Sequence, residues 1–209
     1  MSNRKTWGIG VLWGMALVLP LSNLVNGETD RRDPGVRFVN NGDGTITDFQ
    51  TGLMWEVKDN SGGLHDKDNT YTWSSTAPNP DGTLFAHFLA EINSNSHDTA
   101  TNAQSEVRFD GYTDWRIPTI VELQTLRDSN CRSGPPCVVD PIFHTNCMPG
   151  CLIVTFDPAN ACSCTAAIDY WSSTSFNLSS AWGVRFYNGS VITNSKTSVR
   201  YARAVRGGQ

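Results

Sequence analysis

Apolar and polar residues alternate in short runs at both ends of the chain, and such alternation is typical of β-strands with one buried face. Clusters of Gly, Asn, Asp and Ser separate the runs and favour turns. The pattern predicts strands over residues 36–39, 45–48, 53–57, 170–174, 181–188, 190–194 and 199–206. The first three form a small antiparallel meander. Asn188-Gly189 lies between two of the late runs and is the usual signal of a type I′ hairpin turn.

One helix is predicted over residues 83–94, where apolar residues recur at the spacing of a helix face. Asp81 or Thr83 stands where such a helix needs a capping side chain. Residues 58–82, which precede this helix, are rich in Asp, Asn, Gly, Ser and Pro. That composition indicates a long loop.

A second helix is predicted over residues 119–128. Thr119 directly follows Pro118, and Glu122 stands three positions later, which is the spacing of a capping box. The order of elements is then strands, two helices, an irregular stretch and strands again. This order predicts an α+β domain whose mixed or antiparallel sheet brings early and late strands together.

The first 27 residues combine a basic start, a long apolar run and a small residue at the exit, which is the composition of a secretory signal peptide. The apolar run is also long enough to be kept as an amino-terminal anchor, so both alternatives stay open. Residues 28–36 are then a polar linker, and residues 37–208 form the domain. We expect no membrane span after the leader, and a location that is secreted, periplasmic or at the cell surface.

All six cysteines fall in an insertion, residues 131–164, that is rich in proline and glycine. An even number of cysteines in an exported chain indicates disulfides. We expect the first to pair with the second, and the other four to pair among themselves without a strained bond between the last two. Zinc binding is disfavoured because there is no pair of CxxC motifs. In chain order the six are Cys131, Cys137, Cys147, Cys151, Cys162 and Cys164.

The net charge of the chain is −4, which argues against general nucleic-acid binding. Charge is nevertheless unevenly placed, because residues 170–209 contain five basic side chains and no acidic one. Such a segment can hold an anion, since arginine matches sulfate and carboxylate groups. The alternative is that these arginines pair with the acidic remainder of the chain. The candidate ligand-binding residues are Arg185, Arg200 and Arg206 for charge, and Trp73 or Tyr187 for stacking.

The tryptophans outside the leader differ in their sequence context. Trp73 lies in the polar loop, so we expect it to be exposed and available for stacking against a ligand. The others lie in patterned segments and are expected in the core: Trp55, Trp115, Trp171 and Trp182.

No motif of a catalytic or metal site is found in the sequence. The four histidines are scattered, and hydrolase, nucleotide-binding and zinc-protease motifs are missing. Asn41, Asp43 and Thr45 alternate as calcium ligands do, but the acidic set is incomplete and a glycine-rich turn is favoured. We therefore expect a protein that is not an enzyme and needs no cofactor.

Several segments resemble one known family, in the same order along the chain. They are residues 37–56, 111–126 with WRIPT and EL, 170–174 with YWSST, 181–191 with AWGVRFYNGSV, and 203–208. The family is the Lcl C-terminal domain, which closes the Lcl collagen-like adhesin. The resemblance implies a C-type-lectin-like fold, which is related to the formylglycine-generating-enzyme fold. It also implies an exported or surface protein that binds glycans, and in the adhesin these glycans are sulfated.

The chain departs from that family pattern in several ways. It has no collagen-like repeat, it adds the six-cysteine insertion, and it lacks the EPN, QPD and WND motifs of calcium-dependent sugar binding. We expect a non-enzymatic, adhesion-type module for glycans or another anionic surface ligand. The alternatives are an enzyme on the related fold and a structural component of the envelope. The sequence leaves the ligand and the oligomeric state open.

Overall fold

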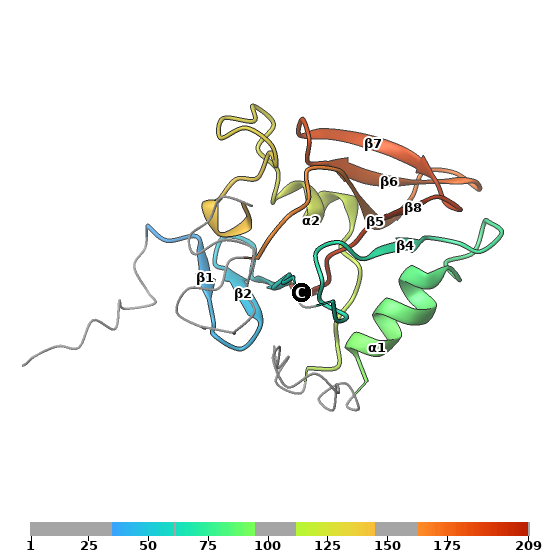
Figure 1. The fold of residues 1–209 in the computed structure, drawn as a ribbon, viewed down its shortest axis with the longest axis horizontal. Coiled ribbons are helices and arrows are strands. Elements are labelled where there is room, and N and C mark those ends of the chain that lie inside the picture. Colours follow the sequence, from blue (N-terminus) through green and yellow to red (C-terminus); the bar gives the residue numbers. More distant parts are fainter. Residues whose placement is uncertain (1–34, 61, 95–111, 145–162, 209) are drawn as a thin grey trace, which may run out of the picture. The chain divides into compact units, whose positions relative to one another are not determined.

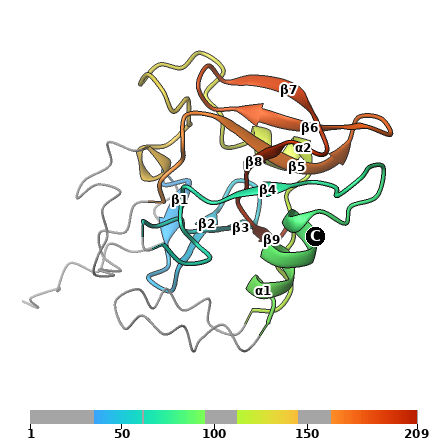
Figure 2. The same ribbon diagram turned by 45° about the vertical axis from the view of Figure 1, so that its right-hand side comes forward.

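Two β-sheets form the frame of the domain (Figure 1 and Figure 2). The computed structural model describes residues 35–60, 62–94, 112–144 and 163–208. The expected signal peptide, the linker up to residue 34, and residues 145–162 of the insertion lie outside the described residues. Within the described ranges, no helix has the length and apolar character that crossing a membrane requires.

The first sheet joins the two ends of the domain. Its strands, in spatial order, are β1 (Phe38–Asn40), β2 (Thr45–Asp48), β3 (Leu53–Glu56) and β9 (Val205–Gly207). All neighbours in this sheet are antiparallel, so the predicted meander is confirmed. Trp55 on β3 lies opposite Val205 on β9. Early and late strands therefore share a sheet, as the sequence predicted.

The second sheet carries most of the late strands. Its strands, in spatial order, are β4 (Thr70–Thr72), β8 (Val199–Tyr201), β5 (Asp169–Ser175), β6 (Ser180–Arg185) and β7 (Ser190–Ser195). β5 and β8 are parallel where Tyr170 meets Tyr201, and the other neighbours are antiparallel. The described part of the chain is therefore an α+β domain with one antiparallel and one mixed sheet.

Two strand predictions were wrong. The run 199–206 is not one strand, because β8 and β9 belong to different sheets and residues 202–204 cross between them. The crossing is fixed by buried contacts: Ala204 donates its backbone N–H to the Glu56 carboxylate at 2.7 Å. In addition, β4 lies inside the stretch 58–82 that was predicted as a loop. The buried residue of β4 is Tyr71, which stacks on Phe88, and Leu64 and Trp73 of the same stretch are buried as well.

The connection between β6 and β7 also differs from the prediction. Arg185 pairs with Ser190, so four residues connect the strands, and Asn188 does not share the positive φ of Gly189. A type I′ turn needs positive φ at both central residues, so that assignment was wrong. The strand ends at Arg185, and the backbone of the buried Phe186 bonds to other segments: its N–H donates to the Ile168 carbonyl at 2.9 Å and its carbonyl accepts from the Cys137 N–H at 2.6 Å.

Both predicted helices are present in shorter form. A π-helical stretch, η1 (Leu84–Leu89), leads into α1 (Ala90–Ile92). Thr83 stands at the amino end without capping it, because its hydroxyl accepts the Thr72 backbone N–H of β4. The second helix, α2 (Ile120–Gln124), contacts β5 and β6 and is followed along the chain by a short 3₁₀ turn, η3 (Pro141–Phe143).

The core consists of two apolar clusters, and the tryptophan predictions can be checked against them. Trp55, Trp115 and Trp171 are buried, as expected. Trp182 is half-buried and packs edge-on against Phe176 at 4.9 Å. The prediction for Trp73 was wrong. This residue is 4% exposed, and its indole N–H donates to the backbone carbonyl of Ser172 on β5 at 3.0 Å.

Candidate functional site

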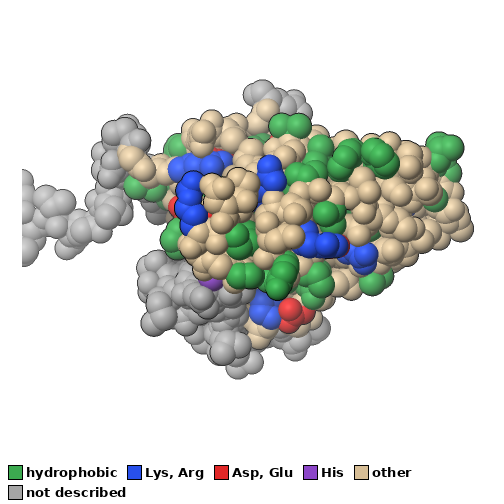
Figure 3. All heavy atoms as spheres, turned by 90° about the horizontal axis from the view of Figure 1, so that it is seen from above, with side chains coloured by type: hydrophobic (Ala, Val, Ile, Leu, Met, Phe, Trp, Pro, Cys, Tyr) green, Lys and Arg blue, Asp and Glu red, His purple; other side chains and the backbone are tan. Residues whose placement is uncertain are grey.

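A pocket of about 520 Å³ opens on the second sheet, where the late basic segment is folded. It takes its walls from β5 with the residues just before it, from the end of β6 and the turn after it, and from β8. The lining residues are Ala167, Ile168, Asp169, Arg185, Tyr187, Val199, Arg200 and Tyr201. On the face shown in Figure 3, more basic than acidic side-chain surface is visible, next to apolar side chains.

Two guanidinium groups converge on one carboxylate in this pocket. Asp169 lies directly opposite Arg185 in the β5–β6 register. Arg185 therefore donates two hydrogen bonds to Asp169, at 2.6 and 3.0 Å. Arg200 reaches the same carboxylate from β8, with Nε 3.3 Å from Oδ2. Two cations against one anion leave a net positive charge at the pocket.

Arg200 is held in place by its neighbours. Its Nε and Nη2 donate to the side-chain oxygen of Asn194 on β7 at 3.0 and 2.9 Å, and its Nη1 donates to the Val199 carbonyl at 2.6 Å. Gly183 on β6 lies beside Asn194, and a Cβ there would come within 2.4 Å of the Tyr170 carbonyl. The glycine therefore allows the close strand packing on which this arrangement depends.

Arg185 is more open than Arg200. Its side chain is 44% exposed. Among the residues that the structure describes, its Nη1 makes no hydrogen bond. Hydrogen bonding to Asp169 raises the pKa of the Arg185 guanidinium, so the group is charged at every pH of interest. Arg185 thus offers donors to an acceptor that enters the pocket.

The rim of the pocket is apolar. Ile168, Tyr187 and Val199 line it and are 45%, 62% and 55% exposed. Exposed apolar side chains grouped around a few polar ones are typical of a ligand-binding site. The arrangement suits a ligand that has an anionic group beside an apolar surface.

Some of the candidate ligand-binding residues named from the sequence lie in the pocket, and others lie outside it. Arg185, Arg200 and Tyr187 come together in the pocket. Arg206 lies apart from them, on β9 of the first sheet, where it donates to Asp114 at 2.7 Å. Trp73 is buried and lines no part of the pocket.

Other pocket residues were missed by sequence reasoning. Asp169 lies one position before the acid-free segment that begins at residue 170. The signal was available, because Asp169 opens the strand that contains YWSST. Ile168 and Val199 are ordinary apolar residues in the sequence, and only the fold exposes them around one opening.

The remaining basic residues of the late segment have buried roles. Lys196 is 2% exposed, donates to the Pro78 carbonyl at 2.9 Å and lies 4.2 Å from the Trp73 ring centre. Arg203 is 1% exposed and donates to backbone carbonyls. The alternative of pairing with acidic side chains is instead confirmed for the other three arginines, since Arg185 and Arg200 pair with Asp169 and Arg206 pairs with Asp114.

A second group of charged side chains is buried next to the first sheet. Oε1 of Glu56 lies 2.8 Å from Nζ of Lys58, with which it forms an ion pair, and 2.8 Å from Nδ1 of His65, with which it shares a hydrogen bond. Burial opposes ionisation of Glu56, but the charges of Lys58 and His65 outweigh it, and the pKa of this carboxyl is lowered. Burial lowers the pKa of Lys58 and also that of His65. The group is enclosed, which favours a role in the fold.

Cysteine chemistry follows the expectation where it can be observed. Cys131 and Cys137 form a disulfide, as predicted. Cys164 is also disulfide-bonded, and no described cysteine is free. Cys147, Cys151 and Cys162 lie outside the described residues, so the pairing of the last four stays a prediction.

The weak calcium-loop pattern is a turn in the structure. The Asp43 carboxylate accepts from the backbone N–H of Thr45, and the Asn41 amide donates to the Thr45 hydroxyl. These oxygens therefore satisfy neighbouring donors, as the turn interpretation predicted. The described ranges contain no group of three side chains that could hold a metal ion.

Comparison with known proteins supports the resemblance seen in the sequence. The model of the Lcl C-terminal domain matches residues 44–206 of the 209-residue chain. No curated protein matches the chain significantly. The match covers the second sheet, the two helices, every residue that lines the pocket, and the first sheet apart from β1 and the last residue of β9. This chain belongs to the Lcl C-terminal domain family.

Proposed function

We propose that this protein is an exported, non-enzymatic binding module that holds an anionic group of a glycan or another surface ligand. The observation that carries the proposal is the pair Arg185 and Arg200 in a pocket with an apolar rim. Family membership is consistent with an adhesion-type role, because the resemblance implies glycan binding. The disulfides support export, since stable cross-links persist in oxidising compartments.

In the proposed complex, the ligand anion accepts hydrogen bonds from Nη1 of Arg185. Arginine presents its donors as a planar fork: in Arg185, Nε and Nη2 bind Asp169, and this leaves Nη1 to donate to a sulfate or carboxylate oxygen. The exposed ring of Tyr187 packs against the apolar face of a sugar ring. Asp169 keeps both guanidinium groups oriented and limits the net charge, which favours recognition of single anionic groups, such as the sulfates of a glycan chain, over diffuse attraction to charge alone.

We extend the proposal to the C-type-lectin-like fold that the resemblance implies. It is supported by the pairing of the early meander with the last strand, and by two short helices beside mixed and antiparallel strands. The described cysteines are all in disulfides, so none of them offers the free thiol that a cysteine-based enzyme on the related fold would need.

The test is binding of dextran sulfate, measured by calorimetry at two salt concentrations. Arg185→Ala removes the open donors and should weaken binding about tenfold, the usual scale for charged hydrogen bonds. Arg200→Ala should also weaken binding. Arg206→Ala is the matched control, because it removes the same charge outside the pocket and should change affinity less than about twofold.

Equal losses for all three variants would mean diffuse attraction to a polyanion, and the pocket proposal would then be wrong. Arg185→Lys separates charge from geometry. It keeps the cation but loses the fork, so we expect it to restore only part of the affinity. If the Arg185→Lys variant bound as tightly as the unchanged protein, the geometry of the guanidinium group would play no part in binding.

A further inference from the structure

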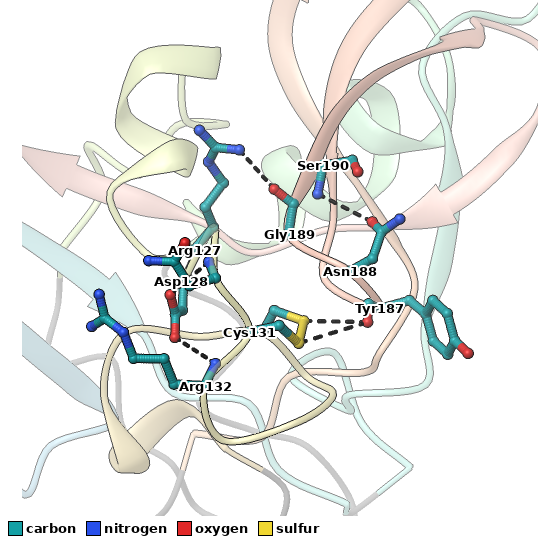
Figure 4. The surroundings of a disulfide bond; sticks show 10 residues. Arg127, Asp128, Cys131, Arg132, Tyr187, Asn188, Gly189 and Ser190 are labelled. Carbon is teal, nitrogen blue, oxygen red and sulfur yellow. Dashed lines mark hydrogen bonds between the residues drawn. A yellow bond between two sulfur atoms is a disulfide. The ribbon is translucent and has the colours of Figure 1, made fainter.

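The turn 186–189 carries one wall of the pocket, and a disulfide-closed loop, residues 127–138, lies against it (Figure 4). The backbone N–H of Cys137 donates to the Phe186 carbonyl at 2.6 Å. Arg127 donates through Nη1 to the Gly189 carbonyl, also at 2.6 Å. Both ends of the turn are thus tied to the loop.

The disulfide itself lies under the middle of the turn. The Tyr187 carbonyl oxygen is 3.2 Å from Sγ of Cys137 and 3.9 Å from Sγ of Cys131. In Figure 4 this carbonyl points toward the sulfur atoms and the tyrosine ring points away from them. The ring is the part of Tyr187 that is free to meet a ligand.

The loop and the turn pack tightly at Gly189. This residue has a φ of +68°, and a Cβ there would lie 2.5 Å from the Asp128 carbonyl oxygen. The loop is also braced from within, since Asp128 accepts the backbone N–H groups of Asn130 and Arg132. At the base of the loop the Asp128 backbone N–H donates to the Cys137 carbonyl at 2.8 Å, and the disulfide closes the part between Cys131 and Cys137.

We propose that the Cys131–Cys137 loop is a positioning element for Tyr187, so that ligand affinity depends on this cross-link. The inference rests on the proposed function of the pocket and adds a determinant outside its lining. Without the cross-link, the loop gains conformational freedom and no longer presents the Cys137 N–H and the sulfur surface to the turn. The turn then samples positions in which Tyr187 does not close the pocket.

Amide hydrogen exchange tests the positioning directly and needs no ligand. The double variant Cys131→Ser/Cys137→Ser should exchange faster than the unchanged protein over residues 186–190, while β5 keeps its protection. Ser133→Ala is the matched control, since it alters an exposed residue of the same loop and keeps the disulfide. Unchanged exchange over 186–190 in the double variant would overturn the inference.

Binding of dextran sulfate in a double-mutant cycle with Tyr187→Ala supplies the second test. Loss of the cross-link should weaken binding about tenfold when Tyr187 is present, and less than about twofold when it is alanine. Equal weakening in both backgrounds would show that the loop does not act through Tyr187. If the unchanged protein does not bind, or Arg185→Ala has no effect, the proposed function fails and the exchange result still decides the positioning.

A second variant covers the case in which the double variant does not fold. Gly189→Ala keeps the disulfide but places a methyl group against the Asp128 carbonyl, which forces the turn away from the loop. We expect the same faster exchange over 186–190 and the same dependence of binding on Tyr187. A Gly189→Ala protein with unchanged exchange and unchanged affinity would contradict the inference.

Discussion

The side chain of Arg203 is buried where the chain crosses from the second sheet to the first. Arg203 lies between β8 and β9, and it donates to the Glu56 carbonyl at 2.7 Å and to the Cys164 carbonyl at 2.9 Å. It also bonds Ser163 and Thr165, so the end of the cysteine-rich insertion is fixed to the first sheet. Burial lowers the pKa of Arg203, and the nearby Glu56 carboxylate opposes that effect.

Replacing Arg203 should therefore be costly. Arg203→Met leaves the buried carbonyls of Glu56, Ser163 and Cys164 without their donor, and it removes a positive charge near the Glu56 carboxylate. We expect a loss of about 3–5 kcal/mol in the free energy of unfolding. Urea denaturation measures this loss. Arg206→Met is the control, because its ion pair with the largely exposed Asp114 should be worth less than about 1 kcal/mol. Similar losses for both variants would contradict the role given to Arg203.

Gly183 makes a second prediction at the scale of one residue. In Gly183→Ala the new Cβ would stand 2.4 Å from the Tyr170 carbonyl, so β5 and β6 must separate. We expect a loss of about 1–3 kcal/mol in stability, together with weaker ligand binding, because Arg185 lies on the same strand. Thermal unfolding and dextran sulfate calorimetry measure the two effects. An unchanged melting temperature together with an unchanged affinity would show that β5 and β6 can accommodate a methyl group at this position.

At the scale of elements, the best-defined signal in the sequence is the start of α2. Thr119 caps the helix by accepting the Glu122 backbone N–H, and the Glu122 carboxylate accepts the Thr119 N–H at 2.8 Å. Arg116 adds two hydrogen bonds to the same carboxylate at 2.7 and 2.6 Å. Arg116 also donates to the Gly207 carbonyl, which ties this short helix to the first sheet.

The cap should contribute measurably to stability. Thr119→Ala removes one side-chain acceptor and should lower the free energy of unfolding by about 1 kcal/mol. Thr119→Ser keeps the hydroxyl and is the matched control, with an expected change of a few tenths of a kcal/mol at most. Chemical denaturation distinguishes the two. A serine variant as unstable as the alanine variant would indicate that the methyl group matters and the cap does not.

The whole molecule is held by buried and partly buried ionic groups, and these define its response to acid. Burial tends to raise the pKa of Asp48, but the hydrogen bonds from Arg37 outweigh it and the value falls below 3.8. The pKa of Glu122 is lowered below 4.5 in the same way, through Arg116. His65 is different, because burial lowers its pKa from 6.5 despite its bond to Glu56.

Stability should therefore fall in two stages on acidification. The unfolded chain binds a proton at His65 more readily than the folded one, so stability begins to decline as the pH falls below 6.5. Asp48 and Glu122 contribute stability that is complete when the pH is above their pKa in the unfolded chain. This stability is lost as the pH falls through their lower pKa in the folded protein. Melting temperatures between pH 8 and pH 3 measure both stages.

Two variants assign those stages. His65→Gln should remove the first stage and keep the second, while Asp48→Asn should reduce the second and keep the first. A melting temperature that stays constant from pH 8 to pH 3 would contradict the predicted linkage for all of these groups.

What the sequence determined by itself is local. Turn-forming residues between short alternating runs specified the meander, and the Thr119–Glu122 spacing specified the start of α2. The Cys131–Cys137 disulfide was also predictable, because its partners are only six positions apart. Such features depend on contacts between residues that are only a few positions apart, so the interacting residues can be recognised from the sequence alone. The family followed from motifs of the same short range.

Only the tertiary structure decided which distant residues meet. It divided the run 199–206 between two sheets, buried Trp73 under β5, and brought Asp169 between two arginines from different strands. Strand pairing and burial depend on partners that lie tens of residues away, and residue type alone does not identify those partners. The pocket is for this reason a property of the folded chain, although each of its charged residues is plain in the sequence.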